Sequence, residues 1–525
     1  MSDRTAAAAI SAAVLGFLYG VYALLVHPVY VNRLSAIPGP KPKNFPFTIL
    51  GNIPEIIKEE AAAPYLRWAK QFKSGVIRYH HLFNRPRVLV YSSTGLRHVF
   101  GTHASRYGKD SATFEQLNRV LGKGLLTVED NLHKHHRAII NPVFRVKHIN
   151  SLVPTFITSG VETRNAWNAK LSTAANNQLE VELSEEMSKP TLDVIGRAGF
   201  GYEFNAVSDG QSPLYEQYKF VLSRFNISEA LINTLLPFLN WIVPSRKRAR
   251  IQFNLAAAEI QRNCREILET RKAAVASGND AANDLVSVLL KANHAENEKS
   301  RLTDEDVMAQ AMTFLAAGHE TTSVALTWTL DFLANNPKVQ QTLLAELRTQ
   351  MPLPDSEPSL EYITSTKTYL DAVCKESLRL VPPAPLTSRI ALQDDEIDGF
   401  FIPKGTTVFI SPAVNHRLEE FWGPDVLEFK PERWMSSNTD SNGEADHEGD
   451  SSTTGKPYGA YMPFLLGPRN CIGQRFAVLE MKALLAVFVR AFEFVKVEQG
   501  IVKKKLLLTW KPHPGLQMKI QKVKE

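Results

Sequence analysis

Residues 5–32 of this 525-residue chain contain no Asp, Glu, Lys or Arg. About 20 apolar residues suffice to cross a bilayer as a helix, so this segment is long enough to span a membrane. The alternative is a cleaved signal peptide, whose apolar stretch is only about 7–15 residues long and follows a basic flank. Here the only charged side chains before the segment are Asp3 and Arg4. The segment therefore favours a retained membrane anchor.

Basic residues follow the anchor at Arg33, Lys41 and Lys43. Positive charge beside a spanning helix favours a cytosolic body and a luminal N-terminus. We therefore expect a single-pass protein of the endoplasmic reticulum membrane with its main domain in the cytosol.

Composition excludes several classes of protein. Hydrophobic residues make up 44% of the chain, which is typical of a globular protein and not of a disordered or many-pass membrane protein. The 60 Lys and Arg residues exceed the 54 Asp and Glu residues only slightly, which argues against nucleic acid as a partner. The three cysteines are far apart and form no CxxC pair, so a reducing compartment is expected.

A proline-rich segment follows the anchor, with Pro38, Pro40 and Pro42 at alternate positions. Because proline fixes φ and excludes helix, this segment should be a stiff, extended link. No later change in composition divides the chain. We predict three parts: an anchor at 1–36, a hinge at 37–44 and one catalytic domain at 45–525.

Helical spacing of apolar residues dominates this large domain. We expect helices at 64–73, 193–198, 251–274, 304–333, 338–348 and 476–492. Shorter strand-like runs lie at 88–91 and 400–410. The fold class is therefore mainly α with small β-sheets (α+β). Residues 276–282 and 435–457 are polar and are expected to be solvated loops.

Residues 464–473 (FLLGPRNCIG) combine one cysteine with two glycines, an arginine and a phenylalanine. Cys471 directly precedes the predicted helix 476–492, and a helix N-terminus lowers the pKa of a thiol and stabilises the metal-binding thiolate. Gly467 and Gly473 would let the backbone approach a flat cofactor closely. Arg469 could pair with a carboxylate.

The other two cysteines, Cys264 and Cys374, lie inside helical patterns. Isolated cysteines of this kind usually pack as small hydrophobic residues. Cys471 is therefore the one candidate metal ligand among the three.

The segment 464–473 resembles the haem-binding signature of the cytochrome P450 superfamily at each fixed position. The resemblance places Cys471 as the axial ligand of the iron, with Phe464, Arg469 and Gly473 as cofactor-binding neighbours. Three further segments resemble family motifs in the family's order: 317–322 (AGHETT), 376–379 (ESLR) and 431–434 (PERW). The resemblance implies haem b as cofactor and the cytochrome P450 fold with one N-terminal transmembrane helix.

The segment 317–322 lies within the predicted helix 304–333, which begins at a capping box formed by Thr303 and Asp306. By resemblance, Thr321 donates a hydrogen bond to dioxygen and Glu320 carries protons from solvent. The alternative is that Thr321 bonds back to its own helix and Glu320 lies on a solvated face. His319 is expected to be a packing residue, because the cysteine already supplies the axial ligand.

Glu376 and Arg379 are three residues apart on one helix and can form an ion pair. The resemblance implies that Arg433 joins them in a buried network that determines the fold. We assign this network no part in the chemistry, because a buried charge network is costly to break.

The family's Trp-x-x-x-Arg pattern, which reaches a haem propionate, is altered here. His133 stands in the place of the tryptophan, and Arg137 is retained. Histidine can still donate to a carboxylate, so both residues stay cofactor-binding candidates, together with Arg389. A zinc site at the neighbouring histidines is the weaker alternative, because no cysteine or acidic pair joins them at ligand spacing.

The resemblance implies a monooxygenase that takes electrons, ultimately from NADPH, through an NADPH–cytochrome P450 reductase, with cytochrome b5 as a second candidate partner. Basic residues near the histidines suggest a docking surface for an acidic redox partner: Lys134, Arg145 and Lys147. We expect a lipophilic substrate, such as a terpenoid or polyketide secondary metabolite of a fungus. By analogy with the family, apolar residues line the pocket: Phe114, Phe314, Leu235, Phe238 and Leu386.

Two other functions stay open at this point. One is a haem-thiolate isomerase or dehydratase that needs no reductase. The other is a non-enzymatic membrane protein that binds haem or a lipophile. An intact pair of Glu320 and Thr321 favours the monooxygenase over both.

Overall fold

The computed structural model describes most of the chain. The described residues are 2–42, 49–110, 117–118, 121–209, 216–217, 220–221, 238, 242–277, 283–297, 300–435, 455–506 and 508–524. The predicted loop at 435–457 and the second half of the loop at 276–282 lie largely outside these residues.

The chain forms two compact units, each built from three separate stretches of sequence. Unit 1 contains 1–110, 385–426 and 445–469; unit 2 contains 111–384, 427–444 and 470–525. The division into anchor, hinge and one catalytic domain stays a prediction, since units interleaved in sequence do not test it.

Unit 1 is built on a five-stranded sheet with strand order β1-β2-β8-β5-β3. The strands are β1 (Val76–His80), β2 (Pro86–Val90), β3 (Tyr107–Gly108), β5 (Thr387–Ala391) and β8 (Thr407–Ile410). Neighbouring strands are antiparallel except β2 and β8, which are parallel. A separate hairpin pairs β6 (Asp395–Ile397) with β7 (Phe400–Ile402). The predicted strands at 88–91 and 400–410 are therefore present.

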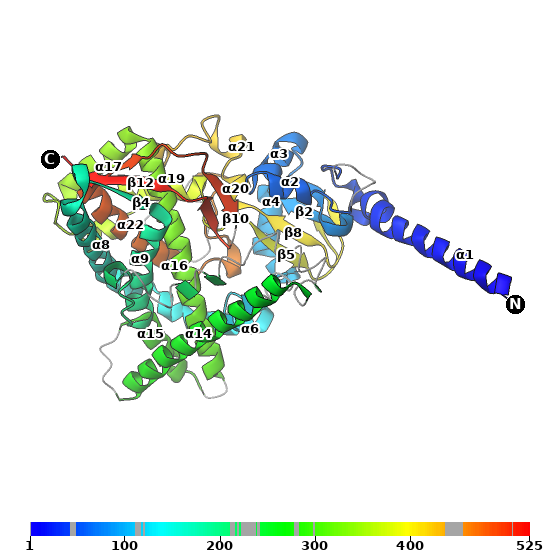
Figure 1. Cartoon of the computed structure of the whole chain (residues 1–525), viewed down its shortest axis with the longest axis horizontal. Coiled ribbons are helices and arrows are strands. Elements are labelled where there is room, and N and C mark those ends of the chain that lie inside the picture. Colours follow the sequence, from blue (N-terminus) through cyan, green and yellow to red (C-terminus); the bar gives the residue numbers. More distant parts are fainter. Residues whose placement is uncertain are drawn as a thin grey trace. The chain divides into compact units, whose positions relative to one another are not determined.

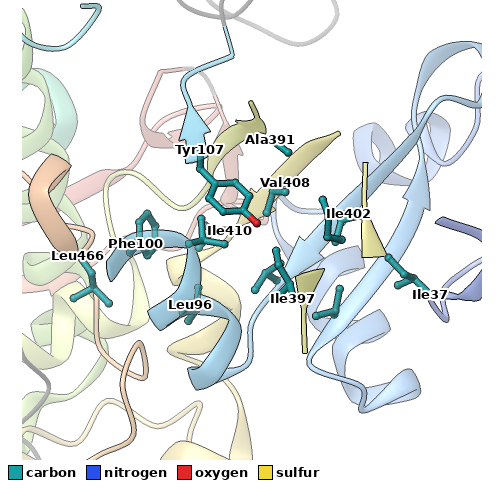
Figure 2. Packing of buried hydrophobic residues seen from close by; sticks show 14 of the residues in the cluster. Ile37, Leu96, Phe100, Tyr107, Ala391, Ile397, Ile402, Val408, Ile410 and Leu466 are labelled. Carbon is teal, nitrogen blue, oxygen red and sulfur yellow. The ribbon is translucent and has the colours of Figure 1, made fainter. Parts of the chain in front are cut away.

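Short helices surround the sheet of unit 1. They are α2 (Ile53–Lys58), α3 (Ala63–Phe72), η3 (Leu82–Asn84), α4 (Ser93–Arg97), η4 (His98–Thr102), η5 (Ala104–Arg106), α20 (Pro412–Asn415), α21 (Glu419–Trp422) and η12 (Gly467–Arg469). Figure 2 shows one face of the sheet, where Ile402, Val408 and Ile410 pack with Phe100 and Leu466 in a buried cluster. The segment just before the cysteine is thus anchored in this core.

The N-terminal part of unit 1 consists of α1 (Ser2–Val21), the π-helix η1 (Tyr22–Val31) and η2 (Arg33–Ala36). Residues Ala7–Val31 have a mean hydropathy of 2.1 and are long and apolar enough to cross a membrane. Figure 1 shows α1 projecting away from the strands of unit 1. This helix suits the expected membrane anchor.

Unit 2 is mainly helical (Figure 1). Its α-helices are α6 (Asp130–Ile140), α7 (Val146–Ser151), α8 (Val153–Thr173), α9 (Leu183–Val194), α10 (Ala206–Asp209), α14 (Pro244–Ala276), α15 (Leu285–Ala295), α16 (Asp304–Asn335), α17 (Pro337–Gln350), α18 (Leu360–Thr364), α19 (Tyr369–Leu380) and α22 (Gln474–Ala491). Its shorter helical turns are η6 (Asn141–Phe144), η7 (Ala175–Asn177), η8 (Ile195–Phe200) and η10 (Pro431–Trp434). The predicted helices are all present, and 193–198 spans the end of α9 and the start of η8.

Two small sheets complete unit 2. One pairs β10 (Lys503–Leu506) with β11 (Trp510–His513). The other has the order β4-β12-β9, from Gln178–Glu182, Gln517–Lys522 and Phe492–Lys496. The mainly α fold with small β-sheets is therefore confirmed.

Helix α16 is the longest buried helix of unit 2 and packs against α9, α19 and α22. The expected capping box begins it: the Thr303 hydroxyl accepts from the Asp306 N–H, and the Asp306 carboxylate accepts from the Thr303 N–H, both at 3.1 Å. It ends before Pro337, which occupies the first position of α17.

Candidate active site

Cys471 lies at the entrance to α22, a helix that is buried along most of its length. Unlike Cys264 and Cys374, which are buried as predicted, Cys471 is exposed. The backbone N–H of Gly473, the N-cap residue of the helix, hydrogen-bonds to the Cys471 sulfur. The helix therefore offers its free N–H groups to this one accessible thiol.

The surroundings of Cys471 raise the pKa of its thiol above the ordinary value. Desolvation by the packed protein is the largest cause, while the Gly473 N–H and the charge of Arg137 act in the opposite direction. The N–H at the helix N-terminus therefore lowers this pKa as expected, but desolvation outweighs it. A bound metal ion displaces the thiol proton, so the thiol can still become a thiolate ligand.

Arg137, on α6, holds the residue next to the cysteine. Its Nη1 donates to the Asn470 carbonyl at 2.7 Å and its Nη2 to Asn470 Oδ1 at 2.8 Å. Its Nε donates to Asn141 Oδ1 at 3.2 Å. Arg137 therefore fixes the backbone that carries Cys471. His133, one turn earlier on α6, is buried.

Gly467 is required by unit 1 itself. Its φ is +73°, and a Cβ built on it would lie 1.9 Å from the Phe100 carbonyl oxygen. Only glycine can adopt this backbone and approach so closely. From the sequence, Gly467 was expected to let the backbone approach a flat cofactor. In the structure, the group that lies close to Gly467 is the main-chain carbonyl of Phe100.

Arg469 and Arg389 both belong to unit 1. Arg469 Nη1 donates to the carbonyls of Ala104 and Tyr107 at 2.9 and 2.8 Å. Arg389 is buried, donates to the Ser388 carbonyl at 2.8 Å, and lies over the Phe100 ring. The two arginines thus border the same segment, 100–107, and Phe464 is half-buried in the same unit.

One strip of α16 is accessible within an otherwise buried stretch. From Ala309 to Leu330 every residue is buried except Ala317, Gly318 and Thr321, which share a helix face. A Cβ at Gly318 would lie 2.9 Å from Ile195 Cδ1. A glycine at this position lets α16 pack closely against η8. The accessible strip of Ala317, Gly318 and Thr321 lies at this contact.

The Thr321 hydroxyl donates to the Ala317 carbonyl at 2.7 Å, one turn earlier in the helix. This is the back-bonding alternative considered from the sequence. A hydroxyl has a single proton, so donation to any ligand requires the Thr321 hydroxyl to turn away from Ala317.

Glu320 does not lie on a solvated face. Its side chain is buried, accepts a hydrogen bond from Thr509 Oγ1 at 2.9 Å, and pairs with Lys511 Nζ at 2.8 Å. Lys511 is 28% exposed, so its ammonium links the buried carboxylate to solvent. Neither Thr509 nor Lys511 was predicted as a partner of Glu320, since no motif near residues 509–511 indicates a contact with α16.

His319 is buried as expected for a packing residue, and burial lowers its pKa to about 4. It is therefore neutral at physiological pH. The residues on either side of it in sequence, Gly318 and Glu320, therefore carry the space and the acidic group of the site.

Known proteins resemble this chain along most of its length. The cytochrome P450 family model matches residues 40–520. Cytochrome P450 monooxygenase 205 of Postia placenta is 34% identical over 497 residues, covering 90% of this chain and 88% of that protein. Cytochrome P450 monooxygenase sphH of Aspergillus fumigatus is 31% identical over 483 residues, covering 90% and 85%. The chain belongs to the cytochrome P450 family. It is a monooxygenase, and its relatives are fungal.

The residues of this cytochrome P450 fit a haem. Among the described residues no group of three or more His, Cys, Asp or Glu side chains could hold a metal ion. A lone accessible thiol suits an iron whose other ligands come from a porphyrin.

The network around Glu376 is complete in this cytochrome P450. Arg379 binds both Glu376 carboxylate oxygens at 2.8 Å, and Arg433 Nε donates to Oε1 at 3.1 Å. Trp434 Nε1 and the Lys430 N–H also donate to this carboxylate. The side chains of Glu376 and Arg379 are fully buried. The predicted ion network is thus confirmed, and Trp434 is an additional member.

The predicted pocket residues have different outcomes. Phe114 and Leu235 lie outside the described residues. Phe314, on α16, is buried, and Phe238 is exposed. Leu386 is partly buried against a cluster of unit 1 that contains Tyr65, Trp68 and Tyr79.

Proposed function

We propose that this cytochrome P450 binds haem b through Cys471 and oxidises a lipophilic small molecule, by hydroxylation or epoxidation, with electrons from an NADPH–cytochrome P450 reductase. When bound, the haem supplies the activation of dioxygen that lets one oxygen atom enter a C–H or C=C bond. A secondary metabolite such as a terpenoid or polyketide is the proposed substrate. The proposed location is the endoplasmic reticulum membrane.

The observation that carries this proposal is the exposed Cys471 thiol at the start of the buried helix α22. Arg137 fixes the Cys471 backbone through Asn470. His133, Arg137, Arg389 and Arg469 are the proposed partners of the two propionates, since imidazole and guanidinium N–H groups donate to carboxylates. Phe464 and Gly473 are the proposed packing contacts of the cofactor.

Two residues of α16 are the proposed catalytic residues. Thr321 would donate a hydrogen bond at the accessible strip after turning from the Ala317 carbonyl. Glu320 would supply a proton, because it is buried beside the strip and is linked to solvent through Lys511.

Three exposed basic residues support a docking site for the reductase, with cytochrome b5 as an additional candidate partner. Lys134, Arg145 and Lys147 are exposed on or beside α6 and α7. Positive charge of this kind attracts an acidic partner and increases the rate of encounter.

The experiment that tests the proposal is the carbon monoxide difference spectrum of the reduced protein. We expect the absorbance band typical of a thiolate-ligated haem in the wild type and its loss in Cys471→Ser. Cys374→Ser, a buried cysteine away from the motif, is the matched control and should keep the band. A band that persists in Cys471→Ser would show that the ligand is another residue.

Turnover in the same preparation tests the reaction class. Product formation should require NADPH, the reductase and dioxygen. Conversion of a substrate without NADPH or reductase would favour the isomerase or dehydratase alternative. Analysis of the metabolite that accumulates after gene deletion would then identify the substrate.

A further inference from the structure

The cytosolic end of the membrane helix is fixed to unit 1 by specific hydrogen bonds. Pro28 lies inside η1 and has no N–H to donate within the helix. Asn84 Nδ2 donates to the Leu24 carbonyl at 3.1 Å. Arg78 Nη1 donates to the Val29 carbonyl at 3.0 Å. Two side chains of the sheet unit thus bind carbonyls of the π-helix.

The segment that follows the helix is also built into unit 1. Leu34 and Ile37 are each 2% exposed and belong to the core cluster shown in Figure 2. The Arg78 N–H donates to the Pro38 carbonyl at 2.9 Å. A Cβ at Gly39 would lie 1.8 Å from the Arg78 carbonyl oxygen. The helix end and the sheet therefore have a fixed relation within unit 1.

The length of the apolar helix places this docked end at the membrane surface. The apolar stretch Ala7–Val31 has 25 residues, whereas about 20 are needed to cross the hydrocarbon core. About five residues at the C-terminal end, starting near His27, can therefore lie at the depth of the lipid headgroups.

A cavity lies at this docked end. Its volume is about 440 Å³, and it lies between η1 and the segment that leads into β2. The lining residues are Ala23, Leu24, His27, Pro28, Asn32, Phe83, Arg85 and Pro86. Arg85 is the only arginine or lysine among them, and none of them is acidic. The lining therefore combines the permanent positive charge of Arg85 and the polar side chains of His27 and Asn32 with apolar walls.

We propose that this cavity binds the phosphate headgroup of a membrane glycerophospholipid, with Arg85 as the charge partner. A guanidinium binds phosphate oxygens through two N–H donors, and an anionic headgroup meets no opposing carboxylate here. Leu24 and Phe83 offer apolar contact to the glycerol and the first carbons of an acyl chain. The hydrogen bonds from Asn84 and Arg78 hold the walls in place, as expected for a largely preformed site. The proposal rests on the membrane anchor in the proposed function and on no part of its chemistry.

The test is a titration of the full-length, haem-loaded protein in non-ionic detergent with dihexanoyl-phosphatidylglycerol, followed by calorimetry. We expect saturable binding that weakens about tenfold or more in Arg85→Gln, because a charge-assisted contact is lost. Arg97→Gln removes the same charge from an exposed position of unit 1 that does not line the cavity, and it should bind like the wild type. Ala23→Phe keeps every charge and fills the cavity, so it should also abolish binding.

Three results would overturn the proposal. These are unchanged binding in Arg85→Gln, equal loss in Arg97→Gln, and equal affinity for glycerol phosphate, which would indicate a site for free phosphate. Two further measurements separate this from the proposed function. The carbon monoxide spectrum reports the haem site in each variant, and flotation with phosphatidylcholine vesicles reports the anchor. A variant that floats and keeps its spectrum but loses phosphatidylglycerol binding supports the cavity alone.

Discussion

At the residue scale, the site depends on the hydrogen-bond and ion-pair partners of its polar side chains. Glu320 is buried on α16, yet Lys511 and Thr509 stabilise its carboxylate from the C-terminal hairpin of unit 2. The hairpin is itself held to α16, because Trp328 Nε1 donates to the Trp510 carbonyl at 2.7 Å. Glu320 therefore owes its position to residues far along the chain.

We predict that Lys511→Met lowers the yield of product per NADPH consumed. Removing the ammonium leaves a buried carboxylate with one hydroxyl partner and removes its link to solvent, which slows proton delivery and destabilises the protein by about 1–3 kcal/mol. Lys503→Met, on the neighbouring strand β10, is the control and should leave the product yield unchanged. An unaltered product yield in Lys511→Met would exclude a role of Lys511 in positioning Glu320.

Glu480 on α22 gives a second prediction at this scale. It is 1% exposed, and burial raises its pKa well above 4.5, against a smaller lowering by Thr322. The folded state therefore binds this proton more tightly than the unfolded state. The resulting stability is fully present below the unfolded pKa of about 4.3 and is lost as pH rises through the folded pKa.

Glu480→Gln keeps the shape of the protonated acid without its titration. Near pH 4 the variant and the wild type should unfold at similar denaturant concentrations. Above this pH the variant should become the more stable one, by up to about 1.4 kcal/mol for each pH unit. Urea unfolding across pH 4–8 measures the difference. A constant difference over this range would show that Glu480 does not titrate in this way.

At the element scale, α19 and the segment Pro431–Trp434 are joined through one carboxylate. Glu376 accepts hydrogen bonds from Arg379, Arg433 and Trp434 and from the Lys430 N–H. A single acidic side chain thus binds two arginines and fixes η10 against α19.

We predict that Glu376→Ala destabilises the protein by about 3–5 kcal/mol, because it leaves Arg379 buried without its counter-ion. The variant should unfold at lower urea concentration and retain less haem after purification. The control Glu361→Ala removes an exposed carboxylate from α18 and should change stability by less than about 0.5 kcal/mol. Equal stability of the two variants would contradict the fold-determining role of the network.

At the scale of the whole molecule, the N-terminal region contains two physically different parts. Helix α1 is largely exposed, whereas Leu34 and Ile37 lie in the core of unit 1. The proline-rich segment is extended, as its sequence predicts, and it is also packed against β1.

Two truncations should therefore behave differently. Removing residues 2–21 should leave the free energy of unfolding unchanged, because none of the α1 side chains that the structure describes is buried. Removing residues 2–42 deletes Leu34 and Ile37 as well and should cost about 4 kcal/mol or more. Urea unfolding of both proteins measures the effect. If they are equally stable, the segment after the helix contributes nothing to the core of unit 1.

Local interactions were predictable because they lie within one or two helical turns. Residue type and spacing predict the capping box at Thr303 and the bounds of α16. They also predict the pair of Glu376 and Arg379 and the cysteine before α22. The family resemblance then supplied the cofactor and the reaction class. These determinants operate over a few residues, so a single sequence contains them in full.

Only the tertiary structure decided the contacts between residues that are distant in sequence. Lys511 and Thr509 are about 190 residues from Glu320, Phe100 limits Gly467 to glycine, and Asn84 binds the Leu24 carbonyl of the N-terminal helix. Such pairs depend on how helices and strands pack, and neither charge nor spacing in the sequence specifies that packing. The sequence determined that a thiol, an acid and a membrane helix are present; the packing determined what each of them touches.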